Sequence, residues 1–182
     1  MSRTAASTLE FALLGLIRQG LGSGYKLRKQ FSTTPMGHYS DSPGSIYPAL
    51  KRLEQRRWIR RLKEDGGPRR RQSYGVTQAG ESALRAWMMR PMAREDVVKR
   101  QDELLLRFAF MGQAADGATA ITFLEGYARE CAGYARELRK FLATMPQETA
   151  ESGRLALENG VAGYETQARW ARRALARLRR PK

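Results

Sequence analysis

The chain has 182 residues but only one cysteine, Cys131, and one histidine, His38. A single cysteine excludes an intrachain disulfide framework and fits a reducing compartment, so the expected location is cytoplasmic. One histidine leaves little acid–base chemistry near neutral pH, and the GxSxG, P-loop and HExxH patterns are absent. We therefore expect that the protein is not an enzyme and that it has no cofactor and no metal site.

Long hydrophobic runs are also missing. The longest near-continuous apolar stretch, residues 11–17, is too short to span a bilayer, and residues 1–10 lack a hydrophobic segment adequate for secretion. Hydrophobic residues nevertheless make up 42% of the chain, which is ample for a buried core and argues against global disorder. A chain of this length holds one substantial domain or two small ones.

Acidic residues are few, 18 against 33 basic ones, and the formal net charge is +15. The excess is concentrated in two places. Residues 51–71 carry ten basic and three acidic side chains, a net charge of +7, and residues 169–182 carry seven basic side chains and no acid. An arginine-rich composition inherited from a GC-rich genome is the alternative reading. Clustering favours a polyanion-binding surface, to which arginine contributes bidentate contacts with phosphate or guanine.

Residues 42–77, SPGSIYPALKRLEQRRWIRRLKEDGGPRRRQSYGVT, are the most informative segment. They predict a short helix, a strand, a turn, a second strand and the start of another helix. A helix fits the major groove of DNA and a basic two-stranded turn can lie along phosphates. Two amphipathic helices precede this segment, so the order of elements predicts a winged helix-turn-helix.

Pro48 decides where the helix of this segment begins, because a proline in a helix interior removes a hydrogen bond. If Ser45 is the N-cap, Pro48 falls in the first turn, where no amide partner is needed. We expect an irregular turn near Ser42 and a regular helix from Ile46. The buried stripe is then Ile46, Ala49, Leu50 and Leu53, and the outward face is Ser45, Pro48, Lys51, Arg52 and Gln55.

The second half of the chain carries no strand signal. Residues 95–111 predict one amphipathic helix, and two longer helices follow in which apolar residues alternate spacings of three and four. This rhythm predicts a coiled-coil hairpin, which buries too little by itself and is expected to dimerise. The expected dimerisation residues are Leu124, Tyr127, Cys131, Tyr134, Leu138, Phe141, Leu157, Val161, Tyr164 and Leu175.

Four segments of the chain carry a resemblance: LEFALLGLI (9–17), SGYKL (23–27), SPGSIYPALKRLE (42–54) and GGPRRR…YGVT (66–77). In their order and spacing they resemble the PadR family of bacterial transcriptional regulators. The all-helical remainder is similar to the larger PadR subfamily, whose C-terminal helices dimerise. Two departures are Arg57, where many relatives have glycine, and Gln72-Ser73, where a basic–aromatic pair is more usual.

The resemblance implies a mainly α fold with a small β-wing. Residues 1–91 would form a winged helix-turn-helix DNA-binding domain, and residues 92–182 an all-α, coiled-coil-like dimerisation domain. The implied function is sequence-specific transcriptional regulation by a homodimer on a palindromic double-stranded DNA operator. Repression released by a small-molecule effector of unknown type is the expected mode.

The resemblance also implies which residues lie at DNA. Tyr25, Ser42, Gly44, Ser45, Tyr47 and Lys51 would lie at or beside it, and Gly67, Pro68, Arg69, Arg70 and Arg71 would form the wing. Physical chemistry supports these expectations, because small residues at a helix N-terminus let the backbone approach phosphate. The Tyr47 hydroxyl can reach phosphate and Lys51 a base edge or phosphate, while the wing arginines can follow the backbone or enter the minor groove. The outward-facing Arg52 completes the expected set.

Other readings stay open at this point. In the first structural alternative, Tyr25 and Tyr47 are core aromatics with only their hydroxyls exposed to water. In the second, the wing arginines are a solvated run of charged side chains. Cys131 is most simply a buried small hydrophobe. An alternative function is a protein-interaction or anionic membrane-surface module that uses residues 169–182, although their apolar face is thin and rich in alanine.

Overall fold

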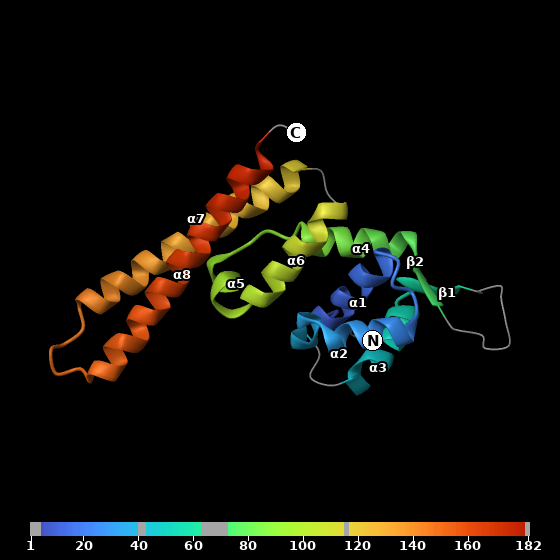
Figure 1. Ribbon diagram of the computed structural model, residues 1–182, viewed down its shortest axis with the longest axis horizontal. Helices are drawn as coiled ribbons and strands as arrows, with labels where there is room; N and C mark the ends of the chain where they lie inside the picture. Colours follow the sequence, from blue (N-terminus) through green and yellow to red (C-terminus); the bar gives the residue numbers. More distant parts are fainter. Residues whose placement is uncertain (1–4, 40–42, 63–72, 115–116, 181–182) are drawn as a thin grey trace. The chain divides into compact units, whose positions relative to one another are not determined.

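The computed structural model describes residues 5–39, 43–62, 73–114 and 117–180 and divides the chain into two compact units, Met1–Met89 and Arg90–Lys182 (Figure 1). Over these described ranges the structure is mostly helical, with one two-stranded antiparallel sheet in unit 1. The mainly α fold with a small β-wing is therefore confirmed. The division lies two residues before the expected domain boundary, and the role assigned to each half stays a prediction.

Unit 1 begins with α1 (Thr8–Arg18), whose start is fixed by reciprocal capping. The Ser7 hydroxyl accepts from the Glu10 amide at 3.3 Å, and the Glu10 carboxylate accepts from the Ser7 amide at 2.8 Å. Gly20, with φ +93°, turns the chain after this helix, a conformation that side chains rarely adopt. Next come α2 (Gly24–Thr33) and the 3₁₀ turn η1 (Pro35–Tyr39).

The expected irregular turn before the third helix is confirmed. A 3₁₀ turn, η2 (Pro43–Ser45), leads directly into α3 (Ile46–Gln55), so Pro48 lies in the first α-helical turn. Ile46, Ala49, Leu50 and Leu53 are buried, as the periodicity predicts. They pack toward α1, and the opposite side of α3 is therefore left to solvent.

The wing strands β1 (Ile59–Leu62) and β2 (Ser73–Val76) pair without interruption, from Ile59 opposite Val76 to Leu62 opposite Ser73. The Tyr74 amide also donates to the Gly22 carbonyl at 2.8 Å, which ties β2 to the connection between α1 and α2. After the wing, the Thr77 hydroxyl accepts from the Gly80 amide at 3.1 Å and caps α4 (Gln78–Met88).

Stacked aromatic rings join α1 to α4 and to the start of the wing. Phe11 stacks on Trp87 with ring centroids 4.6 Å apart and lies 5.7 Å from Trp58. Leu13, Leu14 and other α1 side chains are also buried. These contacts complete a winged helix-turn-helix core within one chain.

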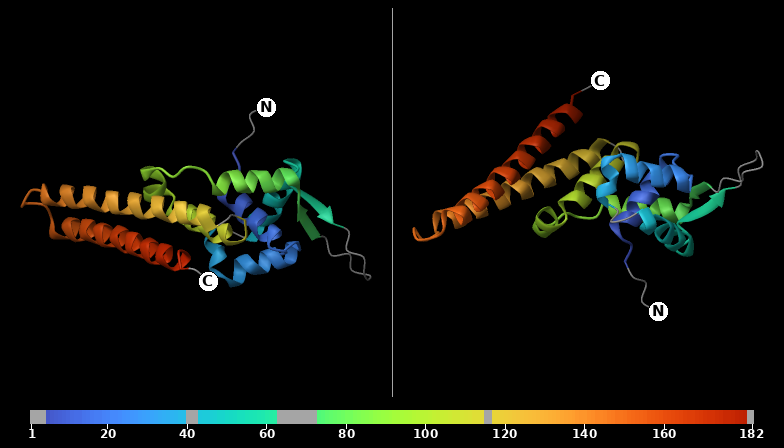
Figure 2. Two further views of the ribbon diagram at one scale, coloured as in Figure 1. Left: turned by 90° about the horizontal axis from the view of Figure 1, so that it is seen from above. Right: turned by 60° about the horizontal axis from the view of Figure 1, so that its bottom comes forward.

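The described residues of unit 2 form four helices: α5 (Arg94–Lys99), α6 (Gln101–Ala114), α7 (Gly117–Ala143) and α8 (Glu151–Leu178). The last two run side by side as a hairpin, which two further views show clearly (Figure 2). The single helix expected over residues 95–111 is wrong, because the backbone leaves helical geometry at Arg100, with φ −138°. No helix in the described ranges is both long enough and apolar enough to cross a membrane.

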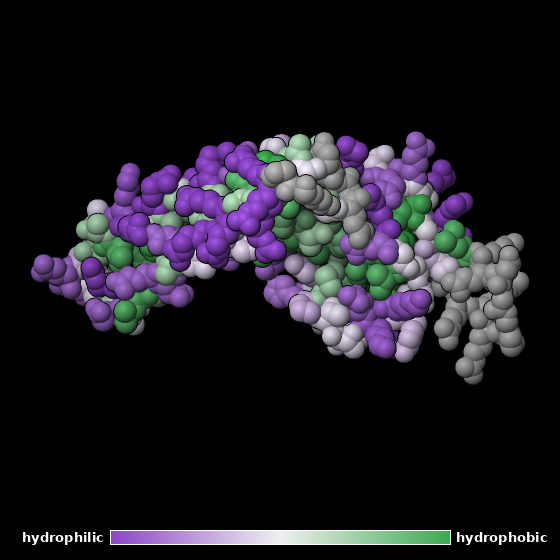
Figure 3. Space-filling model, turned by 45° about the horizontal axis from the view of Figure 1, so that its top comes forward, coloured by the Kyte–Doolittle hydropathy of each residue, from purple (hydrophilic) through white to green (hydrophobic). Residues whose placement is uncertain are grey.

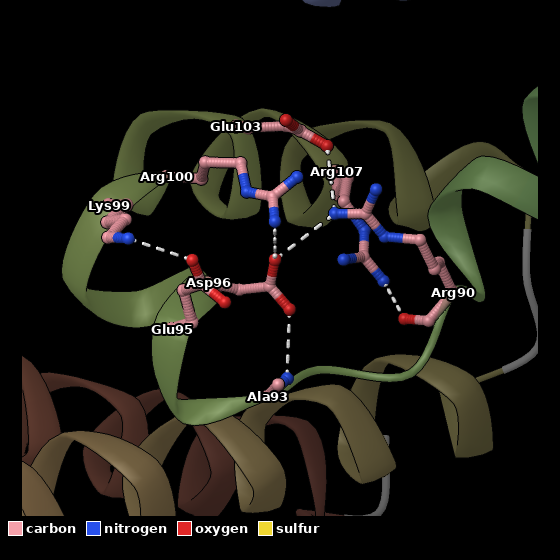
Figure 4. A network of polar contacts seen from close by, with 8 residues as sticks. All are labelled: Arg90, Ala93, Glu95, Asp96, Lys99, Arg100, Glu103 and Arg107. Atoms are coloured by element: carbon pink, nitrogen blue, oxygen red, sulfur yellow. Dashed lines mark hydrogen bonds and ion pairs between the residues drawn. The ribbon is translucent and has the colours of Figure 1, made fainter. Parts of the chain in front are cut away.

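A buried carboxylate gathers polar contacts at the corner between α5 and α6 (Figure 4). Asp96 accepts from the Ala93 amide at 2.9 Å and pairs with Arg90 at 3.3 Å and with Arg100 at 3.2 Å. Arg107, only 1% exposed, donates to the carbonyl of Arg90, and burial lowers the pKa of Arg107 to about 10. The corner thus encloses charged groups, which apolar periodicity does not reveal.

Candidate nucleic-acid interface

The solvent side of α3 presents Tyr47 and Lys51 one helical turn apart. Tyr47 is 51% exposed and Lys51 is also exposed, so both expected contact residues are accessible. Gly44, exposed, and Ser45, half-buried, precede them at the helix start. An α-helix that offers such side chains on one face has the shape and chemistry to enter the major groove.

The N-termini of α2 and α3 meet at this surface. A Cβ placed on Gly24 would lie 3.3 Å from Cε1 of Tyr47, so the missing side chain lets the Tyr47 ring approach α2 closely. Tyr25, the next residue of α2, is 62% exposed. Neither tyrosine is a core aromatic, and the fold brings both to the same junction.

An ion pair with Glu10 of α1 orients Arg52. Its Nε lies 3.3 Å from Oε1 of Glu10, and Nε of Arg56 lies 3.6 Å from the same oxygen. Glu10 is only 2% exposed, so two guanidinium groups compensate a buried charge. The guanidinium of Arg56 also lies 5.3 Å from the centre of the Trp58 ring. Sequence reasoning missed Glu10, although an acid within LEFALLGLI, three residues after Ser7, was the available signal.

The first wing strand β1 contributes two exposed arginines that sequence reasoning did not single out, Arg60 and Arg61. Arg61 donates to Glu54 at 2.7 Å, and this hydrogen bond raises the pKa of Arg61. Arg60 has no such carboxylate among the contacts described for the chain. The expected contact residues Ser42, Pro68, Arg69, Arg70 and Arg71 lie outside the described residues and stay predictions.

Arg57 occupies the corner between α3 and β1 with φ +61°. This is the left-handed region, which glycine adopts without cost and other residues do not. The glycine that the resemblance leads us to expect at this position would adopt this backbone conformation without strain. The hydroxyl of Thr77 donates to the carbonyl of Arg57 at 2.7 Å and helps to hold the corner.

The expected dimerisation residues fall into three groups in the single chain. Within it, Tyr127 contacts Trp170 edge to face, with centroids 5.9 Å apart, and Tyr134 meets Tyr164 at 4.7 Å. The hairpin seam is thus already filled by its own two helices near its middle. Leu124, Tyr127, Cys131 and Val161 are buried, Tyr134, Leu138, Leu157, Tyr164 and Leu175 are half-buried, and Phe141 is 61% exposed.

Apolar side chains remain exposed near the turn of the hairpin. Phe141 of α7 and Leu155 of α8 are both largely exposed, and hydrophobic side chains gather at this end of the hairpin in the space-filling view (Figure 3). In contrast, Ala168 and Ala171, where the basic part of α8 begins, are buried. That burial leaves the helix little apolar surface for a membrane, which weakens the alternative function.

No group of three or more His, Cys, Asp or Glu side chains in the described ranges could hold a metal ion. Comparison with protein families gives two matches along the chain. The model described as "Transcriptional regulator PadR-like family" matches residues 13–86, and that described as "Virulence activator alpha C-term" matches residues 101–179. The first contains all of α3 and both wing strands.

Among curated proteins, the chain is similar to the negative transcriptional regulator PadR of Bacillus subtilis. The two are 32% identical over 104 residues, which are 57% of this chain and 56% of that regulator, so the match spans little more than half of the relative. Solved structures of Bacillus subtilis PadR are also similar. One, in complex with operator DNA, is 24% identical and covers 93% of this chain and 98% of its own, with a TM-score of 0.43. Another, in complex with p-coumaric acid, is 21% identical, covers 99% and 100%, and has a TM-score of 0.44.

Proposed function

The chain belongs to the PadR-like family of transcriptional regulators, and from this premise we propose that it is a sequence-specific repressor that binds double-stranded DNA. The observation that carries the proposal is the outward face of α3, with Tyr47 and Lys51 exposed one turn apart. The name of the curated Bacillus subtilis relative, a negative regulator, is the reason for proposing repression.

Contacts that position the protein and contacts that read the sequence fall to different residues. Lys51 reads a base edge, because it lies on the outward face one turn into the regular helix. Tyr25 and Tyr47 donate to phosphates, and backbone amides near Gly44 and Ser45 approach a phosphate at the helix start. Arg52, oriented by Glu10, adds a cation at the edge of the helix. The remaining proposed contacts are Ser42, which precedes α3 in the chain, and the wing residues Pro68, Arg69, Arg70 and Arg71.

The protein acts as a homodimer. Phe141 and Leu155 form an exposed apolar surface on the hairpin, and a second copy covers this surface. A two-fold dimer presents two α3 helices to a palindromic operator whose half-sites lie about one turn, roughly 10 bp, apart. Residues 1–91 thus bind DNA and residues 92–182 dimerise.

Several further features belong to the same proposal. The protein binds rather than catalyses, works in the cytoplasm without a cofactor, and is released from DNA by a small-molecule effector. One cysteine and one histidine in the whole chain support the absence of catalysis and the reducing compartment.

Selection of duplexes from a random pool tests this function. We expect enrichment of one palindrome, followed by a steep loss of affinity with salt. A protein with several phosphate contacts loses about 10³-fold or more between roughly 50 and 200 mM salt. Fluorescence anisotropy on the enriched and on a scrambled duplex measures both effects. Equal affinity for all duplexes, or affinity independent of salt, would contradict the proposal.

A further inference from the structure

A cavity of about 410 Å³ lies between α7 and α8, within unit 2. Its floor consists of three alanines, Ala132, Ala135 and Ala168, of which the last two are buried. Two small residues on one helix facing a third on the other leave a hollow between the backbones. Such a volume is within the range of small-molecule sites, roughly 300–1,000 Å³.

Four arginines surround this floor, two from each helix: Arg136 and Arg139 from α7, and Arg169 and Arg172 from α8. One carboxylate, Glu165, accompanies them, so the lining carries a net charge of +3. Guanidinium groups around one hollow repel each other, and an anion between them relieves that repulsion. The charge of the lining therefore favours an anionic occupant.

The single acid does not serve all four arginines. Glu165 pairs with Arg139, and its second oxygen lies 4.0 Å from Arg169. Arg136 and Arg172 make no ion pair or side-chain hydrogen bond described within residues 5–39, 43–62, 73–114 and 117–180. Two guanidinium forks on opposite walls are thus available, and each matches the paired oxygens of a carboxylate or phosphate.

We propose that this cavity binds a small organic dianion, a dicarboxylate or a phosphate monoester. Its oxyanion oxygens accept hydrogen bonds from Arg136 and Arg172, and its apolar part lies on the alanine floor. As the site of an effector this assignment rests on the proposed function, whereas the binding itself does not. DNA is the less suitable occupant, because the floor of the hollow offers apolar surface that a phosphate backbone does not use.

Isothermal titration calorimetry on the full chain without DNA tests the site. The probes are phthalate for the dicarboxylate, phenyl phosphate for the monoester, and inorganic phosphate for the anion without an apolar part. We expect phthalate or phenyl phosphate to bind more tightly than inorganic phosphate, and the tighter of the two identifies the class. Loss of one charge-assisted contact weakens binding about ten-fold or more.

Arg136→Gln and Arg172→Gln should each show that loss, whereas Arg173→Gln should bind as the unaltered chain does. Arg173 is the matched control, because it is an exposed arginine next to Arg172 that does not line the cavity. Circular dichroism shows whether each variant keeps its helices. Absence of binding by all probes, an equal loss in Arg173→Gln, or inorganic phosphate binding as tightly as phenyl phosphate would each overturn the assignment. None of these results bears on DNA binding, so the two proposals fail separately.

Discussion

In unit 1 the large apolar side chains of α1, α3 and α4 close over one another, whereas in unit 2 Phe141 and Leu155 remain exposed on the hairpin. Unit 1 also exposes Leu62 and Met89, but its candidate contact face presents Tyr25, Tyr47 and basic residues, which suit an external polyanion. On the hairpin of unit 2 the exposed apolar side chains are those that we propose a second copy to cover. The two units therefore differ in the kind of partner that their exposed side chains suit.

Substitution of a buried leucine in unit 1 should give the largest effect. Leu50→Ala removes a buried side chain from the inner face of α3 and is expected to cost about 3 kcal/mol of folding free energy. Urea denaturation followed by circular dichroism measures this. Leu155→Ala in unit 2 is the matched control and should cost far less at low protein concentration, because that side chain is exposed. An equal loss in the free energy of unfolding for Leu50→Ala and Leu155→Ala would contradict the difference drawn between the two units.

Alkaline pH should destabilise unit 2 through Cys131. Burial raises the pKa of this thiol from 9.0 to about 11, so the folded state holds the proton more tightly than the unfolded state. Its contribution is therefore complete below pH 9 and is lost as pH rises through 11. At about 1.4 kcal/mol for each pKa unit, roughly 2–3 kcal/mol is at stake. Denaturation at several pH values should show a shallower decline for Cys131→Ala, and parallel curves would contradict the account.

A charge on the exposed hairpin surface should separate the copies. Phe141→Glu is expected to weaken the homodimer by about 2 kcal/mol, as for a central aromatic of an interface, while the helices persist. Analytical ultracentrifugation measures the dimer dissociation constant. Arg129→Glu, another exposed position of α7, is the control and should change it little. If Phe141→Glu dimerises as the unaltered chain does, the second copy lies elsewhere.

The smallest expected change is a gain in stability at the corner of unit 1. Arg57→Gly relieves the positive φ and should stabilise the chain by about 1 kcal/mol, since glycine adopts this region freely. Arg57→Ala removes the same side chain but keeps the strained backbone, so its thermal midpoint should not rise. A higher midpoint for the alanine variant would instead assign the gain to lost charge repulsion.

The sequence predicted most of unit 1 because its signals are local. Pro48 sets where α3 becomes regular, and the spacing of apolar residues assigns its buried side. Arg57 was recognised as a departure from glycine, but its positive φ depends on the corner that Thr77 holds. Local patterns thus describe elements better than they describe the joints between them.

Unit 2 was predicted less well because tertiary contacts decide it. At the corner with the break at Arg100, Asp96 contacts residues from before and after it in the chain, which apolar spacing does not predict. The heptad rhythm gives Tyr127 and Phe141 equal weight, yet only Tyr127 is covered. Tyr127 is covered by an aromatic cluster from three helices, in which Phe108 of α6 and Trp170 of α8 take part. The spacing of apolar residues predicts which side chains share a helix face, but it does not predict which other side chains cover that face.

The central claim is that α3 reads DNA, and anisotropy titrations of Lys51→Ala test it most directly. Lys140→Ala is the control, because it removes the same charge from unit 2. Both protein variants are titrated with the selected duplex and with duplexes that carry a substitution at each base pair in turn. We predict that Lys51→Ala loses about 1–3 kcal/mol on the selected duplex and its preference at one base pair, while Lys140→Ala keeps both. Full affinity and unchanged preference in Lys51→Ala would contradict the assignment of α3 as the reading element.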